Sequence, residues 1–209
     1  SSAFAVAAWP QLTMPRRKKY LPLRVRLSAM AVVLWATKLA AFLFYRILHV
    51  GHDGRLDTTL STVTGAAMFW TISWLWGVLC SLPHTLGATS SSPGVPVLTY
   101  LGFFLFDLGF AIESLSDYQK WQFKAAQNNN DGFCDVGLWR YSQHPNFFGN
   151  LVLWFGILVM NAPALKSSSI RFIAIFLSPL FLWTLLSGQA NGTITNAVQM
   201  SFDKYGHNP

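Results

Sequence analysis

The chain has 209 residues, of which 52% are hydrophobic, 15% are aromatic and only 11% are charged. A soluble domain carries about 25% charged residues, so this composition excludes a disordered chain and argues against a soluble globular protein. The net charge of +7 would raise the question of nucleic-acid binding in a soluble protein. Here the first basic cluster directly precedes an apolar stretch, where juxtamembrane positive charge belongs. The composition therefore predicts an integral membrane protein that binds no nucleic acid.

Five apolar stretches follow in chain order, each about 16–24 residues long and near the length that crosses a bilayer. They lie at about 27–50, 60–82, 97–112, 147–162 and 170–186. We expect an all-α, multi-pass bundle of about five or six membrane helices. Residues 1–26 form a basic juxtamembrane N-terminal segment, and residues 27–209 form a single membrane domain. The two cysteines, Cys80 and Cys134, are not arranged as C-x-x-C, so no metal site is expected.

The third stretch does not end where its apolar residues end. Glu113, Asp117, Lys120 and Lys124 follow at spacings of four, three and four, which places them on one stripe of a helix. The pattern predicts an amphipathic helical extension that leaves the membrane. Taken alone, such a segment is typical of an interfacial helix with a solvated charged stripe.

Alternation of the five segments places seven of the eight acidic residues on the side that also receives this extension. A polar site is therefore expected to open on that side. Lys and Arg divide almost evenly between the two sides, so the positive-inside rule does not give the orientation. The eighth acidic residue, Asp107, lies inside the third segment, and Lys38 lies inside the first. Each needs a polar partner in the membrane, and a Lys38–Asp107 pair is one arrangement that the sequence allows.

A second polar segment, G-L-W-R-Y-S-Q-H-P-N-F-F-G-N over residues 137–150, leads directly into the fourth apolar stretch. Pro145 suits the start of a helix. Asn146 and Asn150 lie one turn apart at that start, and Arg140 adds positive charge. Free backbone N–H groups at a helix N-terminus suit phosphate. Of the five histidines, His144 in this segment is the one most expected to take part in a site.

This run resembles the signature of the steroid 5-alpha-reductase C-terminal superfamily. More narrowly, it is similar to a membrane branch described as a domain of unknown function, whose pattern is G-L-W-x-Y-S-R-H-P-N-Y-x-G-E. The run E-S-L-S-D-Y-Q-K-W-Q-F-K from Glu113 to Lys124 matches that branch as well. The resemblance extends over about Leu34 to Tyr205. Its other matching residues are Arg46, Gly51, Asp53, Arg55, Ser187 and Gly188.

The resemblance implies a membrane reductase that moves a hydride from NADPH to a conjugated C=C bond of a sterol- or isoprenoid-type lipid. It also implies that the cofactor-binding residues are Glu113, Asp117, Lys124, Arg140, Tyr141, His144, Asn146 and Asn150. The proton donor has no candidate residue. The family default is the endoplasmic reticulum membrane, and the leader-like Ser2-Ala3-Phe4 makes a plastid membrane the alternative.

Three departures from the pattern keep other functions open. Gln143 replaces the usual Arg, Phe147 replaces Tyr, and Asn150 replaces Glu. The Glu–Tyr pair with which steroid reductases polarise their substrate is also missing, because no Glu precedes Glu113 and Leu43 stands at the Tyr position. The second hypothesis is therefore a catalytically degenerate relative that serves as a structural subunit of a larger membrane complex. The third is an S-adenosylmethionine-dependent membrane methyltransferase, a class that shares an R-H-P-x-Y-x-G run.

Overall fold

The computed structural model describes residues 21–50, 60–126, 134–189 and 191. Within these ranges five helices are long and apolar enough to cross a membrane, and no strand occurs. The predicted all-α, multi-pass bundle is confirmed. The helices are α3 (Leu23–Val50), α5 (Val63–Ala88), α6 (Pro96–Ala126), α7 (Pro145–Asn161) and a last span, Ser169–Gln189, that begins with α8 (Ser169–Ala174) and continues as a helix over residues 177–189. Two 3-10 helices, η1 (Gly137–Arg140) and η2 (Ala162–Leu165), flank α7.

Two helix boundaries matter for the site, and one of them differs from the sequence prediction. Helix α3 begins at Leu23 rather than near residue 27, so Arg24 and Arg26 belong to the helix. Helix α6 runs without a break to Ala126, which confirms the predicted helical extension. Gly51, Asp53, Arg55 and the leader-like Ser2-Ala3-Phe4 lie outside the described residues.

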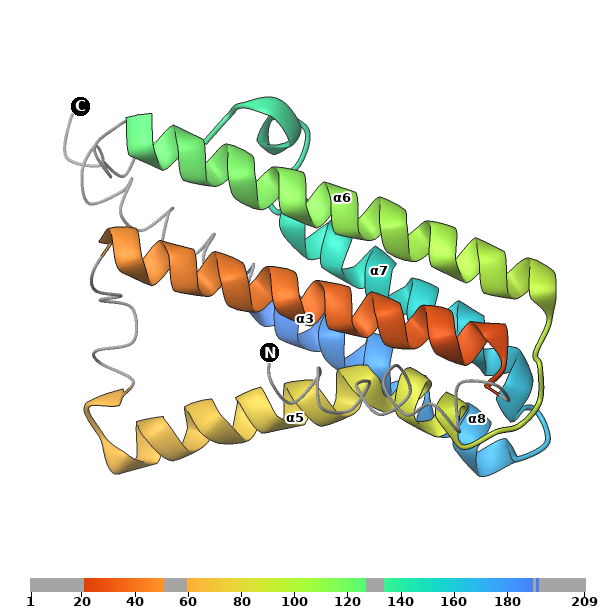
Figure 1. Ribbon diagram of the computed structural model, residues 1–209. Helices are drawn as coiled ribbons and strands as arrows, with labels where there is room; N and C mark the ends of the chain where they lie inside the picture. The colour runs from red at the N-terminus through yellow and green to blue at the C-terminus, as the bar shows by residue number, and fades with distance from the viewer. Residues whose placement is uncertain (1–20, 51–59, 127–133, 190, 192–209) are drawn as a thin grey trace, which may run out of the picture.

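Helices α6 and α7 run antiparallel and in direct backbone contact (Figure 1). Four glycines line the contact, Gly102 and Gly109 on α6 and Gly149 and Gly156 on α7. A Cβ atom on Gly102 would lie 2.5 Å from the carbonyl oxygen of Gly156, and one on Gly109 would lie 2.5 Å from that of Gly149. Each pair is seven residues apart, which keeps the small residues in one seam where two helices cross at a shallow angle. The seam sets the register between the two helices.

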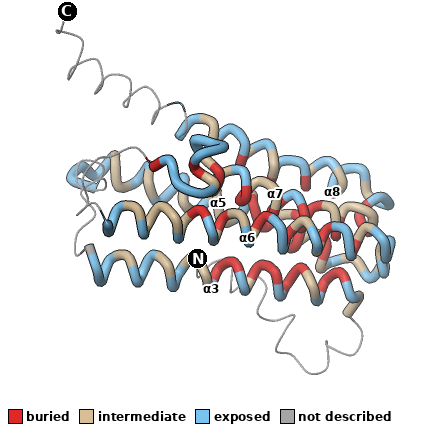
Figure 2. The backbone as a smooth tube through the Cα atoms, turned by 90° about the horizontal axis from the view of Figure 1, so that it is seen from above, coloured by how far each residue is buried: buried red, intermediate tan, exposed pale blue. Residues whose placement is uncertain are grey.

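The first half of α3 completes the core (Figure 2). Trp35 is fully buried and meets Trp154 of α7 edge-on, with 5.0 Å between ring centroids, and Trp76 of α5 at 5.6 Å. Helix α5 diverges from α3 toward its own N-terminal end (Figure 1), where Trp70 and Trp74 are exposed. Trp76 therefore packs in the core, and the other two face outward as membrane or interface residues.

Arg24 is a fully buried side chain at the start of α3. Its guanidinium donates to the carbonyl oxygens of Gly87 (2.9 Å), Ser90 (2.7 Å) and Ser92 (3.0 Å), and to Oδ1 of Asn161 (3.0 Å). Gly87 belongs to the last turn of α5, whose carbonyl groups lack helical partners. Arg24 thus joins α3, the α5–α6 connection and the end of α7. The sequence pattern assigned Arg24 to the basic juxtamembrane segment before the first helix. That assignment is wrong, because Arg24 lies inside α3 and is fully buried.

His84 lies just beyond the second predicted apolar stretch, which ends near residue 82, and the sequence therefore suggested an ordinary loop position. His84 is instead fully buried inside α5, and its Nδ1 is hydrogen-bonded to the hydroxyl of Ser28 on α3 at 2.9 Å. Together with Arg24, this bond makes a polar contact between the first and second membrane helices near one end of the bundle.

We expect Gly109→Ala to lower the free energy of unfolding by about 2 kcal/mol, because the new methyl group would meet backbone that can move only by separating α6 from α7. Gly188→Ala is the matched control, since nothing lies within 4 Å of a Cβ there. Thermal unfolding of the purified protein in detergent measures both. Equal melting temperatures for the two variants would contradict the close contact.

Arg24→Lys should lower the free energy of unfolding by about 3 kcal/mol, because one ammonium group cannot make the four hydrogen bonds that the planar guanidinium makes in different directions. Arg26→Lys, at an exposed position of the same helix, is the control and should change the melting temperature little. If Arg24→Lys were as stable as the control, the four bonds would contribute no net stability.

Candidate polar site at the end of α6

A half-buried to buried ion-pair cluster links the middle of α3 to the second half of α6. It lies toward the side of the bundle on which both helices end, and this side is called here the polar end. Nζ of Lys38 lies 2.5 Å from Oδ2 of Asp117 and 3.4 Å from Oε1 of Glu113. Trp35 donates its indole N–H to Oε2 of Glu113 at 2.9 Å. A pairing of Lys38 with Asp107 is wrong, because Asp107 lies exposed on a different face of α6.

Helix geometry explains why these residues meet. Trp35 and Lys38 are three residues apart on α3, and Glu113 and Asp117 are four apart on α6, so each pair projects from one face of its helix. Glu113 is held in place from the other side by Gly149 of α7, because a Cβ atom on that glycine would lie 2.6 Å from the backbone nitrogen of Glu113. The glycine seam therefore fixes the position of the carboxylates.

The first turn of α7 adds two asparagines with unused acceptors. Oδ1 of Asn146 and Oδ1 of Asn150 are buried and accept no hydrogen bond. Asn150 lies one turn before Trp154, which packs on Trp35, so it is on the α7 face that is turned toward α3. A buried amide oxygen without a donor costs about 1–3 kcal/mol. These two acceptors are suited to a ligand that brings N–H or O–H donors.

The segment that precedes α7 is attached to α6 by its G-L-W residues. Trp139 donates its indole N–H to the carbonyl oxygen of Ser116 at 2.9 Å, and the backbone N–H of Leu138 donates to Oε1 of Gln119 at 2.9 Å. Nζ of Lys120 lies 4.3 Å from the centre of the Trp139 ring, a favourable cation–π distance. The tryptophan of the motif therefore has a structural function, which is to hold the turn against the last part of α6 (Figure 1).

The remaining residues of the motif form the outer rim of the polar end. Arg140, Tyr141 and Lys124 are exposed. His144 is half-buried and stacks on Phe147, with 4.9 Å between ring centroids. Burial, together with the positive charge of Lys120, lowers the pKa of His144 below its usual value. His144 is thus a neutral imidazole at pH 7, and positive charge at the rim comes from Lys and Arg.

Four of the eight residues predicted to bind the cofactor gather at the ion-pair cluster and the start of α7, namely Glu113, Asp117, Asn146 and Asn150. The other four lie at the rim. Sequence reasoning missed Trp35 as a partner of Glu113. The sequence did contain a signal for this contact. Trp35 lies three residues before Lys38, so its indole N–H is on the same helix face as an intramembrane cation.

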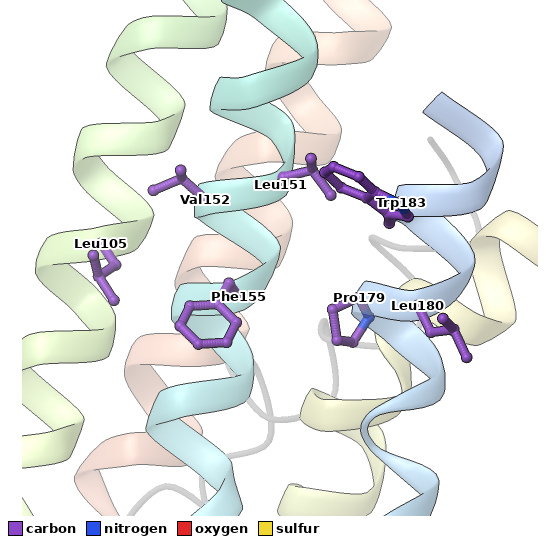
Figure 3. Close-up of a pocket in the computed structure, with 7 residues that line it drawn as sticks. All are labelled: Leu105, Leu151, Val152, Phe155, Pro179, Leu180 and Trp183. Carbon is purple, nitrogen blue, oxygen red and sulfur yellow. The ribbon is translucent and has the colours of Figure 1, made fainter. Parts of the chain in front are cut away.

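An apolar groove of about 480 Å³ opens on the surface between α6, α7 and the last helix (Figure 3). Its position along α7 is set by Val152 and Phe155, which lie on the opposite side of the helix from Asn150 and Trp154, the residues turned toward Trp35. The groove and Asn150 therefore lie on different faces of α7. Its full lining is Leu105, Leu151, Val152, Phe155, Pro179, Leu180 and Trp183.

Residues 1–208 match the family described as "Protein of unknown function (DUF1295)". The chain belongs to this family.

An uncharacterised protein of Schizosaccharomyces pombe is 28% identical over 119 residues, which cover 48% of this chain and 33% of the yeast protein. The match thus includes about a third of that relative's length. No solved structure matches the chain.

Lys38→Met should lower the free energy of unfolding by about 3 kcal/mol, because two partly buried carboxylates would lose their common cation. Neutralising them in the triple variant Lys38→Met, Glu113→Gln, Asp117→Asn should restore part of the loss. Lys124→Met, at an exposed position of the same extension, is the control and should leave the melting temperature in detergent nearly unchanged. A triple variant less stable than Lys38→Met alone would count against the ion pair.

Proposed function

We propose that the protein is a membrane-embedded reductase that uses NADPH to reduce a conjugated C=C bond in a sterol- or isoprenoid-type lipid. The observation that carries the proposal is the pair of buried, unused amide oxygens of Asn146 and Asn150 in the first turns of α7, where Gly149 packs against the backbone of Glu113. Both asparagines lie within the motif of residues 137–150, and the resemblance of this motif to the reductase superfamily points to this chemistry.

The residues at the polar end fit the chemistry of a nicotinamide nucleotide. The carboxamide N–H and ribose O–H groups of such a cofactor are donors, and they match the unused oxygens of Asn146 and Asn150. Its phosphates need positive charge, which the exposed Arg140 and Lys124 supply at the rim. NADPH, when bound, supplies the hydride. The chain's own residues would orient the nucleotide, and the Lys38 ion pair would keep the nearby carboxylates from repelling its phosphates.

The apolar groove is suited to the second substrate. Its lining residues offer almost no polar surface, and it opens toward the lipid rather than toward water. A ring or chain of a sterol- or isoprenoid-type lipid can bury its apolar surface there. We infer that the groove holds the lipid body, while the polar end binds the nucleotide.

The test is NADPH binding to the full-length protein in detergent, followed by NADPH oxidation with a panel of enone sterols and isoprenoids. Asn146→Ala and Asn150→Ala should each raise the Kd about tenfold, as expected for one hydrogen bond. Arg140→Ala and Lys124→Ala should weaken NADPH binding more than NADH binding if they contact the additional phosphate.

Gln143→Ala is the matched control, because Gln143 is exposed in the same turn and should leave the Kd unchanged. Failure of the folded wild-type protein to bind NADPH at millimolar concentration would refute the proposal. Binding of S-adenosylmethionine in the same assay, lost in the asparagine variants, would replace it with the methyltransferase alternative.

The second candidate is a structural subunit of a larger membrane complex. One specific observation favours it, because Glu113 and Asp117 already have a cationic partner in Lys38 within the chain itself. If Lys38→Met had the same reductase activity as the wild-type protein, that activity would argue against the structural-subunit hypothesis. Failure of the wild-type protein to bind nucleotide would support it.

A further inference from the structure

The outer surface of α6 consists of two stripes with different composition. The first contains only aliphatic side chains and suits contact with lipid tails. It comprises Leu101, Leu105, Leu108, Ile112 and Leu115. The second stripe mixes aromatic, small, hydroxyl and carboxyl side chains at alternating spacings of four and three. This second stripe, called here the Asp107 stripe, comprises Tyr100, Phe104, Asp107, Ala111, Ser114 and Tyr118.

The Asp107 stripe has no covering element among the described residues. Tyr100 is 60% exposed, Phe104 61% and Tyr118 55%. Asp107 and Ala111 are exposed as well. The described part of the chain gives Asp107 no ion pair or hydrogen bond, whereas Glu113 and Asp117 share Lys38.

The position of Asp107 along α6 makes this exposure unfavourable. At 1.5 Å per residue it lies about 16 Å from Pro96, which follows the polar connection after α5. The hydrocarbon core of a bilayer is about 30 Å thick, so Asp107 lies near its middle. A carboxyl group that faces lipid tails at that depth is strongly disfavoured unless a partner satisfies it.

The partner must supply a donor at the same depth, and the described residues place no cation against Asp107. The described cations that are buried or half-buried in the helices are engaged, Arg24 with carbonyl oxygens and Lys38 with carboxylates, and Arg46 and Lys120 also have partners. A second copy of the chain would bring another Asp107 and, within the part that the structure describes, no cation on the same stripe. Charge complementarity therefore favours a different protein.

We propose that the Asp107 stripe binds a transmembrane helix of another protein that carries a Lys or Arg at the middle of the membrane, opposite Asp107. The small side chains of Ala111 and Ser114 allow that helix to approach closely. Tyr100 and Phe104 supply contact area on the other side of the carboxylate. The interaction does not depend on whether the polar end binds a nucleotide.

Energy transfer between the labelled full-length protein and synthetic transmembrane peptides in phosphatidylcholine vesicles tests the proposal. One Leu/Ala-rich peptide carries a single Lys at its centre, the second carries Leu there, and the third carries the Lys seven residues nearer to one end. The wild-type protein should bind the central-Lys peptide at least tenfold more tightly than either of the others.

Two pairs of variants give matched controls. Asp107→Leu should lose the tenfold preference, whereas Asp135→Asn, at an exposed carboxylate after α6, should keep it. Ala111→Trp should block the stripe, whereas Leu108→Trp on the aliphatic stripe should not. Asp107→Leu should also leave the melting temperature of the isolated protein unchanged or higher, because it removes a carboxylate that faces lipid.

Three results would overturn the proposal. The first is equal binding of the central-Lys and central-Leu peptides by the wild-type protein. The second is a large fall in the melting temperature of Asp107→Leu, which would place the carboxylate's partner inside this chain. The third is self-association of the wild-type protein that Asp107→Leu abolishes without any peptide, which would make the occupant a second copy.

Discussion

The close contact between the backbones of α6 and α7 is the constraint on which the rest of the structure depends. Four glycines remove the side chains that would otherwise separate the two helices. Their contact fixes Glu113 against Gly149. It thereby sets the position along the bundle axis at which the carboxylates of α6 meet Lys38, and the position at which Asn146 and Asn150 of α7 enter the bundle. In a bilayer, where water does not drive helices together, such packing and internal polar bonds are the main source of association.

The bundle manages its polar groups differently at its two ends. At one end Arg24 satisfies carbonyl oxygens and an amide, and every nitrogen of its guanidinium is used. At the polar end Lys38 pairs with two carboxylates, but two amide oxygens remain without donors. The first arrangement is complete and has the character of a structural contact. The second is incomplete, which is why a ligand is proposed there.

Much of the fold follows from the sequence, because segment length and apolar composition determine which residues can cross a bilayer. The extension of α6 was predictable from the spacing of Glu113 and Asp117. The partner of Lys38 was not, because several carboxylates lie within reach along the sequence and only the register of α3 against α6 selects among them. Arg24 was misplaced for a similar reason, since carbonyl acceptors leave no pattern in the sequence. The resemblance to reductases identified the residues at the polar end but could not separate buried Asn150 from exposed Arg140.

The bonds of Arg24 bear on how the protein is made. Arg24 lies in the first described helix, yet one of its acceptors, Asn161, comes 137 residues later. During synthesis α3 must therefore enter the membrane before the groups that satisfy its arginine exist. The nascent helix then carries an uncompensated guanidinium until α5, its following connection and α7 have been inserted. Insertion of this chain consequently requires that α3 stay near the translocation machinery, or near the membrane surface, until the late helices arrive.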